Sequence, residues 1–549
     1  MNLPRLLCFC SCLLLVACGG NPQEALSVAP PAEDSRPNIL LIVADDLGYA
    51  DLGYYGSEIP TPNLDALAAS GMLLTNFHTG LTCSPTRSML FSGTDSHLAG
   101  LGVMSNPRPD QRGQPGYETY LNFRVASLAD LMTDAGYNTY MAGKWHLGLE
   151  VETSPAARGM KRSFTMLEGG AAHLGGMSFG GPAPLARYRE DFTEITVGDD
   201  FYSTRDYTQR MIDFIETDRE EEKPFFAYLA YTAPHWPLQA PDESIDRFAG
   251  VYDEGYEVLY QTRFERMTAL GILPEGAEPL VEDSFTRPWY SLNDEEKRRE
   301  ARKMEIYAAM VSDLDIYVGE LIDYLKSINE FDNTFIMFMA DNGAEFLTRE
   351  EGSVGFAQWA QNCCDNSYEN MGRIGSYISY GRNWATASAV PFRRHKGTAF
   401  EGGIHVPAFV HYPALGEAGT RRDGFTTVMD LLPTFLALAG TEHPGVRYRG
   451  LDVLPVKGTS LLPLLSGQAS EVHEDTEMFG WELYGHRSIR QGSWKIVWDA
   501  AARPNARWQL FNVVEDPSEQ HDLSAEYPET LSILTALWDQ YEQENGVIY

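Results

Sequence analysis

Polar residues that can bind a cation directly follow two long apolar runs of this sequence. Asp45 and Asp46 follow NILLIVA, and Asp341 and Asn342 follow NTFIMFMA. Oxygen ligands of this kind suit Ca²⁺ or Mg²⁺, whereas zinc takes more histidine and cysteine. A single Asp-Asp pair would only indicate a turn cap, but the second oxygen pair favours a metal site.

Histidines and lysines lie beside other apolar runs. Lys144 and His146 end the segment YNTYMAGKWH, His235 ends PFFAYLAYTAPH, and His395 and Lys396 precede HVPAFVHYP. A lone histidine is usually structural, but several basic groups beside a metal site supply positive charge and proton donors. These residues are therefore candidates for binding an anion and for moving protons.

Cys83 lies in the segment LTCSPTRSMLFSG, residues 81–93. We expect a helix to begin near Pro85, since proline is favoured in the first turn. A helix N-terminus lowers the pKa of a thiol and attracts anions, so Cys83 is either a reactive cysteine or a small buried apolar residue. The loop of a cysteine-dependent phosphatase does not fit, because Arg87 comes too early and Met89 stands where that arginine is needed.

The candidate residues need a fold that brings the ends of separate strands together. Apolar segments alternate with amphipathic helical segments, which predicts an α/β fold with a large, mostly parallel sheet sandwiched by helices. In such sheets, ligands bind at the carboxyl ends of the strands. The predicted strands cover 37–46, 137–146, 224–235, 333–343 and 405–413, and the predicted helices cover 61–71, 127–136, 207–217, 301–328 and 426–440.

The C-terminal part has a different pattern. Segments 487–499 and 507–516 alternate polar and apolar residues and precede a helical segment at 524–543. This pattern predicts a small antiparallel sheet with a terminal helix. We therefore expect a catalytic domain at 37–470 and a small C-terminal α+β subdomain at 471–549.

Two further segments are expected to form the rim of the site. Residues 245–300 are aromatic and charged without clear periodicity, which predicts an irregular insertion on the large domain. Residues 160–200 include a glycine-rich stretch that predicts loops.

The N-terminus has the pattern of an export signal. One basic residue precedes an apolar stretch that ends in LVAC at Cys18. This predicts a signal peptide of the lipoprotein type at 1–18, with Cys18 lipidated, followed by a flexible tether at 19–36. The alternative is an ordinary secretory signal cut near Ala17 or Gly19. Both predict export, and the first predicts a periplasmic or outer-membrane-anchored lipoprotein.

Charge and cysteine content exclude some classes of protein. The formal net charge of −35, from 42 basic and 77 acidic residues, opposes nucleic-acid binding. An anionic substrate must therefore be captured by a locally positive site. Beyond the N-terminal segment only Cys83, Cys363 and Cys364 remain, which is no disulfide framework. The adjacent pair is either a disulfide or two thiols.

With these residues in view, the chain resembles the sulfatase family, in particular bacterial arylsulfatases. The resemblance is carried by Cys83-Ser84-Pro85-Thr86-Arg87, closed by Ser92-Gly93 where the family usually has threonine and glycine. It continues through NILLIVADDLGYADLGYYG, AGKWHLG, APHWP, ADNGAE, FEGGIHVP and the tail. It implies an alkaline-phosphatase-like α/β domain with a small C-terminal sheet.

The resemblance also implies a chemistry. A maturation enzyme that recognises Pro85 and Arg87 oxidises Cys83 to formylglycine. The hydrated aldehyde attacks the sulfur of a sulfate ester on a small molecule or glycan, and its second hydroxyl then expels sulfate.

Roles follow from the same resemblance. It implies one Ca²⁺ ion held by Asp45, Asp46, Asp341 and Asn342. Arg87 holds the aldehyde hydrate, Lys144 and Lys396 bind sulfate oxygens, and His146 assists sulfate expulsion. His235 protonates the leaving oxygen, with Lys396 as helper.

Two other functions stay open at this point. Phosphonate monoester or phosphodiester hydrolases use a similar site on a substrate of the same charge. A lipid-anchored protein that binds sulfated glycans without turnover is the alternative outside enzymes, although every candidate catalytic position is filled.

Overall fold

The computed structural model describes residues 36–178, 185–274, 276–281, 285–351, 355–416 and 418–549. Residues 36–549 form one compact unit. The predicted signal peptide, Cys18 and all of the tether up to residue 35 lie outside the described residues. None of the helices in the described part combines the length and hydrophobicity needed to cross a membrane.

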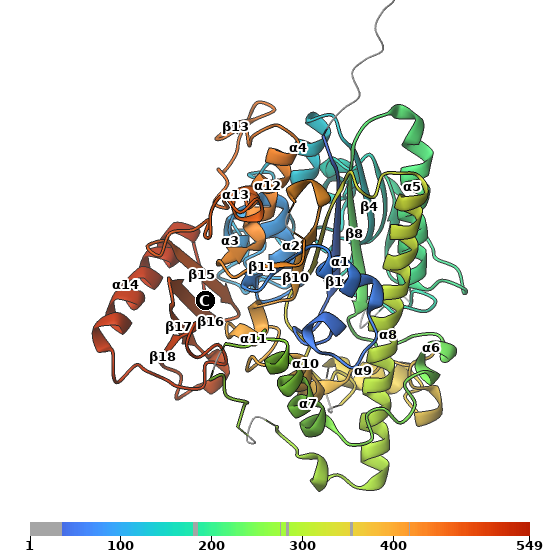
Figure 1. The fold of residues 1–549 in the computed structure, drawn as a ribbon, viewed down its shortest axis with the longest axis vertical. Helices are drawn as coiled ribbons and strands as arrows, with labels where there is room; N and C mark the ends of the chain where they lie inside the picture. The colour runs from blue at the N-terminus through green and yellow to red at the C-terminus, as the bar shows by residue number, and fades with distance from the viewer. Residues whose placement is uncertain (1–35, 179–184, 275, 282–284, 352–354, 417) are drawn as a thin grey trace, which may run out of the picture. The chain divides into compact units, whose positions relative to one another are not determined.

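A sheet of ten strands runs through the centre of this unit (Figure 1). Its order is β11-β2-β10-β9-β1-β8-β4-β5-β6-β7. The strands are β1 (Asn38–Asp45), β2 (Met72–Leu74), β4 (Asn138–Lys144), β5 (Arg162–Met166), β6 (Tyr188–Glu190), β7 (Thr193–Ile195), β8 (Phe225–Pro234), β9 (Thr334–Ala340), β10 (Ala408–His411) and β11 (Thr420–Arg422).

The sheet is mixed, with a parallel centre. Strands β9, β1, β8, β4 and β5 are parallel neighbours, and within the sheet β10 and β6 run against the other eight. All residues of β1, β4, β8 and β9 are buried, as expected for parallel strands covered on both faces. The predicted mostly parallel sheet is confirmed.

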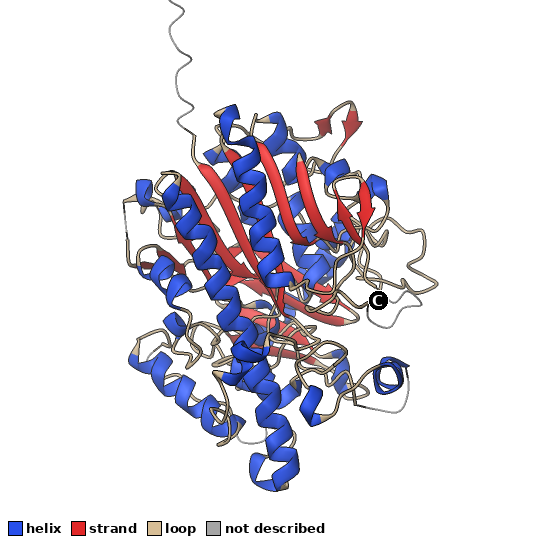
Figure 2. Ribbon diagram, turned by 90° about the vertical axis from the view of Figure 1, so that its right-hand side faces the viewer, coloured by secondary structure: helices blue, strands red, loops and turns tan. Residues whose placement is uncertain are grey.

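Helices cover both faces of the sheet. On one face α5 (Ser203–Asp218) packs on β4 and β8, and α8 (Asp294–Ser327) packs on α5 and on α1 (Pro62–Ala69). Figure 2 shows α8 lying across this face. On the other face α2 (Cys83–Ser92), α4 (Leu128–Asp134) and α12 (Leu431–Leu438) pack together. This arrangement is the predicted sandwich.

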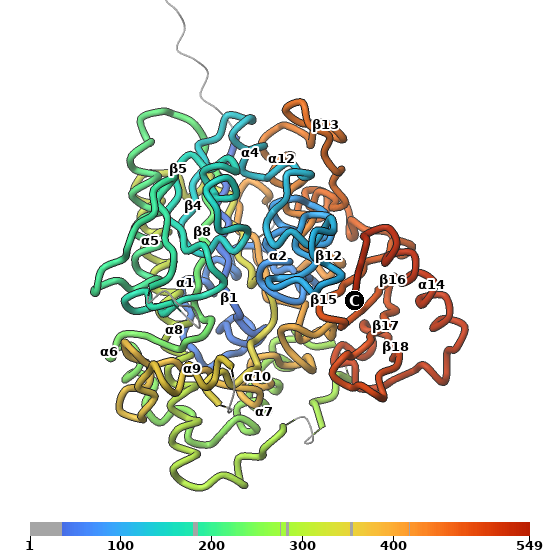
Figure 3. The backbone as a smooth tube through the Cα atoms, turned by 180° about the vertical axis from the view of Figure 1, so that it is seen from behind, coloured from blue at the N-terminus to red at the C-terminus, as the bar shows by residue number. Residues whose placement is uncertain are grey.

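A second sheet of four antiparallel strands follows near the C-terminus. It consists of β15 (Met478–Leu483), β16 (His486–Gln491), β17 (Trp494–Trp498) and β18 (Trp508–Asn512) and is followed by α14 (Pro528–Asn545). Figure 3 shows α14 as the outer layer over this sheet. The predicted small sheet with a terminal helix is confirmed, whereas the domain boundary after residue 470 stays a prediction.

The two faces of the small sheet have different partners. Ile489, Ile496 and Leu510 pack on Trp538 of α14. Leu483, Val497 and Phe511 pack on Leu81 and Phe400 of the large unit, close in sequence to Cys83 and Lys396. The small sheet therefore lies directly beside the candidate site.

Segment 245–300 is more regular than predicted. It contains α7 (Tyr256–Ala269), and α8 begins within it at Asp294, where Asn293 and Glu296 form a capping box. Leu259, Tyr260 and Met267 are among the buried residues of α7. Their helical spacing defines one apolar face that alternating charges conceal in the sequence.

Short elements complete the described part. The remaining strands are β3 (Phe77–His78), β12 (Thr426–Thr427), β13 (Arg447–Tyr448) and β14 (Leu451–Asp452), and the remaining α-helices are α3 (Ser96–Ala99), α6 (Asp242–Asp246), α9 (Gly355–Cys363), α10 (Gly381–Ser388), α11 (Glu401–Ile404) and α13 (Leu462–Leu465). Cys363 and Cys364 form a disulfide.

Candidate active site

The four predicted metal ligands meet at the carboxyl ends of two neighbouring strands. Asp45 ends β1, and Asp341 follows β9, which pairs with β1 residue by residue up to Ala44 and Ala340. The backbone N–H of Asp46 donates to Asp341 Oδ1 at 3.3 Å, and Asn342 Nδ2 donates to Asp46 Oδ1 at 2.7 Å. The side chains are buried, so their charges need partners inside the protein.

Each carboxylate has a cation beside it. Lys144 Nζ lies 2.5 Å from Asp45 Oδ2, and Lys396 Nζ lies 2.7 Å from Asp46 Oδ1. Arg87 donates from Nε and Nη2 to Asp341 Oδ2 at 3.1 and 2.8 Å. The site therefore alternates acids and bases: its three cations balance the three carboxylates, so the local charge is close to zero within a protein of strongly negative net charge.

Arg87 connects three strands. Its Nη1 donates to the carbonyl oxygen of Lys144 at 2.7 Å and to the hydroxyl of Tyr228 at 3.1 Å. The guanidinium thus fixes the ends of β4 and β9 against a residue of β8. Tyr228 was not predicted from the sequence, because a tyrosine within an apolar strand has no local feature that distinguishes it from core.

Cys83 is the first residue of α2 and is 1% exposed. Its Sγ donates to Asp45 Oδ1 at 3.3 Å. Burial and the adjacent carboxylate of Asp45 raise the pKa of the thiol. The pKa of the thiol is therefore raised, not lowered as expected from the helix N-terminus, and burial is the largest cause.

The end of α2 accounts for the Ser-Gly pair. Gly93 adopts a left-handed conformation with φ 62°, and a Cβ there would lie 3.0 Å from Val456 Cγ1. The hydroxyl of Ser92 donates to the carbonyl of Ser88 at 2.6 Å, a bond that threonine can also make.

His235 and His146 lie at the same edge of the sheet. His235 Nε2 is 3.5 Å from Asp46 Oδ2, and its Nδ1 contacts the carbonyl of Trp236. His146 has φ 56° and an Nδ1 that makes no hydrogen bond within the described residues. Any side chain at Gly169 would collide with the His146 ring, since a Cβ would lie 2.7 Å from Cε1.

Both imidazoles are favoured in the neutral form. Burial, followed by the charge of Lys396, lowers the pKa of His235. Burial, followed by the charge of Lys144, lowers the pKa of His146. An anion bound between these lysines opposes the charge effect and brings both groups closer to protonation.

Lys396 reaches the site because β10 is reversed. The segment before β10 starts from the edge at which the parallel strands end. Lys396 Nζ also lies 3.5 Å from Glu345 Oε2. Glu345 was missed as a site residue, although it lies within ADNGAE, directly downstream of two predicted ligands.

A cavity of about 1130 Å³ opens above Cys83, His146, His235 and Lys396. The small sheet and its connecting loops line one side: Tyr484 lies between β15 and β16, His486 begins β16, and Asp499 follows β17. Segment 160–200 contributes Leu167, Glu168 and Gly169, as expected. No described residue of 245–300 lines this cavity, so that part of the predicted rim is wrong; its α7 packs against α10 instead.

The donor set fits a hard divalent cation. Asn342 Oδ1 is buried and makes no hydrogen bond within the described part of the chain. Ligand atoms of Asp45, Asp46, Cys83 and His235 all lie within 4.8 Å of one another. Burial and nearby carboxylates raise the pKa of Asp46 to about 7, and a cation here would favour its ionised form. Asp45, Asp46, Asp341 and Asn342 supply the oxygen ligands that suit a Ca²⁺ ion, whereas Cys83 and His235 of the close group offer sulfur and nitrogen.

The comparisons with known proteins agree with this geometry. A family model described as Sulfatase matches residues 37–441, and one described as N-sulphoglucosamine sulphohydrolase, C-terminal, matches residues 394–546. An uncharacterized sulfatase of Schizosaccharomyces pombe is 44% identical over 529 residues, which cover 94% of this chain and 95% of the relative.

Two further similarities concern a named enzyme and a solved structure. An arylsulfatase of Klebsiella aerogenes is 39% identical over 443 residues, covering 79% of this chain and 93% of the relative. The solved structure of Ps i-CgsB in complex with k-i-k-neocarrahexaose has a TM-score of 0.67 and 26% identity, covering 93% of each chain.

Proposed function

Since the chain belongs to the sulfatase family and is a sulfuric ester hydrolase, we propose that it hydrolyses aryl sulfates to a phenol and sulfate, with formylglycine made from Cys83 as nucleophile and one Ca²⁺ ion. The observation that carries this proposal is the position of Cys83. It starts a buried helix on the floor of the large cavity, beside Asp45 and within the cluster of buried lysines and carboxylates.

The oxygen ligands support the choice of metal. Ca²⁺ would be held by Asp45, Asp46, Asp341 and Asn342. When bound, it supplies positive charge that favours an ionised oxygen nucleophile at position 83.

Lys144 and Lys396 are placed to bind the sulfate group. Each has a buried ammonium that already faces a carboxylate of the site. Positive charge fixed on buried lysines stabilises the additional negative charge that develops during transfer. His235 lies on the cavity wall close to Asp46, where a proton on its ring can pass to the leaving oxygen.

Arg87 and His146 would assist the nucleophile at position 83. Arg87 holds the end of β4 and Asp341 in place and directs charge toward the side chain at 83. The Nδ1 of His146 makes no hydrogen bond within the described residues, and the ring lines the cavity. A neutral imidazole there can accept the proton released when sulfate is expelled.

The cavity wall supports an aryl leaving group. Aromatic side chains from separate segments line it: Tyr120, Phe123, Trp236, Phe346, Phe356 and Tyr484. Flat apolar surfaces favour an aromatic ring over a heavily hydroxylated sugar.

Maturation and export belong to the same proposal. Every residue of α2 is buried, so a maturation enzyme that reads Pro85 and Arg87 must act before α2 packs. An N-terminal signal and a lipid on Cys18 place the enzyme in the periplasm or on the outer membrane.

The test is the mass and chemistry of the peptide that contains Cys83, from protein made in its own host. Conversion replaces sulfur with oxygen and removes two hydrogens, so the peptide becomes lighter and reacts with carbonyl reagents. Turnover of 4-nitrophenyl sulfate is expected to follow the converted fraction, and a phosphonate monoester is expected to be the poorer substrate.

Cys83→Ala is the matched variant. It is expected to fold and bind Ca²⁺ but to lose turnover. An active preparation in which Cys83 is entirely a thiol contradicts the proposal. A higher kcat/KM for the phosphonate ester overturns the choice of substrate but not the nucleophile.

A further inference from the structure

A second group of metal-type ligands lies outside the active site. His78 ends β3, while Glu401 begins α11 and His405 follows it. Glu401 Oε2 lies 2.8 Å from His78 Nε2 and 3.0 Å from His405 Nδ1. The three side chains are buried, and their ligand atoms lie within 4.8 Å of one another.

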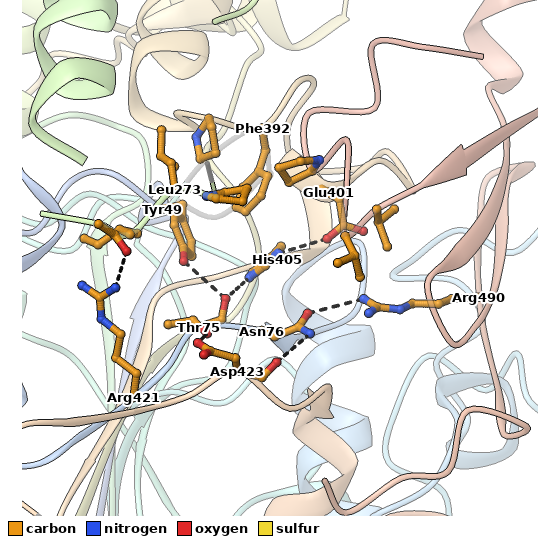
Figure 4. A pocket seen from close by; sticks show the side chains of 17 residues that line it. Tyr49, Thr75, Asn76, Leu273, Phe392, Glu401, His405, Arg421, Asp423 and Arg490 are labelled. Carbon is orange, nitrogen blue, oxygen red and sulfur yellow. Dashed lines mark hydrogen bonds and ion pairs between the residues drawn. The ribbon is translucent and has the colours of Figure 1, made fainter. Parts of the chain in front are cut away.

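The outer ring nitrogens face backbone carbonyl groups. His405 Nε2 is 2.7 Å from the carbonyl oxygen of Thr75, and His78 Nδ1 is 3.2 Å from that of Asn76. Figure 4 shows His405 bridging Thr75 and Glu401. Because a carbonyl oxygen only accepts, the outer nitrogens carry the hydrogens.

The number of protons does not match the number of acceptors. Four ring nitrogens face oxygen atoms, but two neutral imidazoles carry only two N–H groups. The inner nitrogens then direct lone pairs at the carboxylate of Glu401. Two extra protons or one cation between them would satisfy both contacts.

We propose that His78, Glu401 and His405 form a second metal site, which binds a zinc-type divalent ion through His78 Nε2, Glu401 Oε2 and His405 Nδ1. Two imidazoles and a carboxylate are a ligand set that zinc takes with one position left open, whereas Ca²⁺ prefers oxygen alone. Histidines that bind zinc commonly donate their other N–H to a carbonyl group, as both do here.

The geometry needs little change to admit the ion. Bonds of about 2.0–2.1 Å in a tetrahedral site separate the ligand atoms by about 3.3 Å. The present separations of 2.8 and 3.0 Å are only a few tenths of an ångström shorter. A cavity of about 350 Å³ borders Glu401 and His405 (Figure 4). A water molecule from this cavity would take the fourth position.

The surrounding charges leave one carboxylate oxygen for the ion. Lys495 Nζ holds Glu401 Oε1 at 2.6 Å and also pairs with Glu519 at 3.0 Å. Arg490 donates to Asn76 Oδ1 at 3.4 Å. Two protons and one divalent ion bring the same charge into this setting, and only the ion adds bonds to three ligands at once. Since Lys495 belongs to β17, the ion would tie the small sheet to the large unit.

The test is metal binding by the full chain, with Ca²⁺ supplied throughout and transition metals first removed by a zinc-selective chelator. The expected result is saturable binding of one Co²⁺ per chain, with the visible absorption of a tetrahedral site, and displacement by one Zn²⁺. His405→Gln and His78→Gln are expected to weaken binding at least about 100-fold. His411→Gln on neighbouring β10 is the matched control and is expected to bind normally.

Two results would overturn the proposal. The first is no stoichiometric uptake of Co²⁺ or Zn²⁺ by the wild-type chain, or unchanged uptake by a His405→Gln variant with wild-type circular dichroism. The second is a nitrogen NMR spectrum in which both rings stay doubly protonated at saturating zinc. In His405→Gln, the amide of the glutamine can still donate to the Thr75 carbonyl. His78→Gln gives an independent measurement if His405→Gln does not fold.

Discussion

Arg87 is the residue whose geometry most directly sets the position of the others. Its guanidinium donates to Asp341 through Nε and Nη2. The third nitrogen, Nη1, donates to the Lys144 carbonyl and the Tyr228 hydroxyl. A lysine ammonium is a point charge on a flexible stem and cannot hold these groups at once.

Arg87→Lys is therefore expected to lower kcat by about 100-fold or more, because Asp341 and the end of β4 lose their common anchor. Activity is measured per mole of formylglycine, since the same substitution also alters the sequence that the maturation enzyme reads. The matched control is Arg263→Lys, a fully buried arginine that binds Asp51 and Glu58 away from the cavity. It is expected to lower stability but leave kcat of the folded enzyme unchanged; wild-type kcat in Arg87→Lys contradicts the anchoring role.

At the scale of elements, His97 on α3 joins the large unit to the small sheet. Its Nδ1 lies 2.9 Å from Asp95 Oδ1, and its Nε2 lies 3.1 Å from Glu482 Oε2 on β15. Tyr541 of α14 donates to Asp95 Oδ2 at 2.6 Å. Burial alone would lower the pKa of His97, but hydrogen bonds to Asp95 and Glu482 raise it to about 9.

This histidine predicts a loss of stability at alkaline pH. Its pKa in the folded state, about 9, exceeds the unfolded value of 6.5. The stabilisation is therefore complete below pH 6.5 and is lost as the pH rises through about 9, by up to about 3 kcal/mol. Urea unfolding across this range measures it. His97→Gln is expected to flatten the slope, and His521→Gln, at an exposed site, is expected to leave it unchanged. Parallel slopes for wild type and His97→Gln would disprove the assignment.

At the scale of the whole molecule, the net charge of −35 opposes the approach of an anionic ester. The cations of the site attract the substrate only once it is close, whereas the acidic surface repels it from distances of up to about a Debye length. The two effects therefore have opposite dependences on salt, and at low ionic strength the surface dominates.

We expect kcat/KM for 4-nitrophenyl sulfate to rise about twofold to fivefold as KCl is raised from about 10 to about 150 mM, because salt screens the surface. The kcat is expected to stay constant. An uncharged osmolyte at equal osmolality serves as the control, at fixed Ca²⁺. A fall in kcat/KM with salt would mean that the local cations control capture.

The sequence alone determined the parallel α/β core, the small C-terminal sheet and the eight candidate residues placed at strand ends. These features follow from local apolar periodicity and from the rule that the carboxyl ends of parallel strands meet at one edge. Asp45 and Asp341 are almost three hundred residues apart, yet each could be located from the apolar run before it.

Only the tertiary structure decided which groups touch and what their surroundings do to them. It placed β1 between β8 and β9, reversed β10 so that Lys396 reaches the site, and put Tyr484 of the small sheet on the cavity wall. It also raised the pKa of Cys83 against the expected helix effect. These outcomes depend on burial and on contacts between distant segments, and neither is encoded in the residues next to any one position.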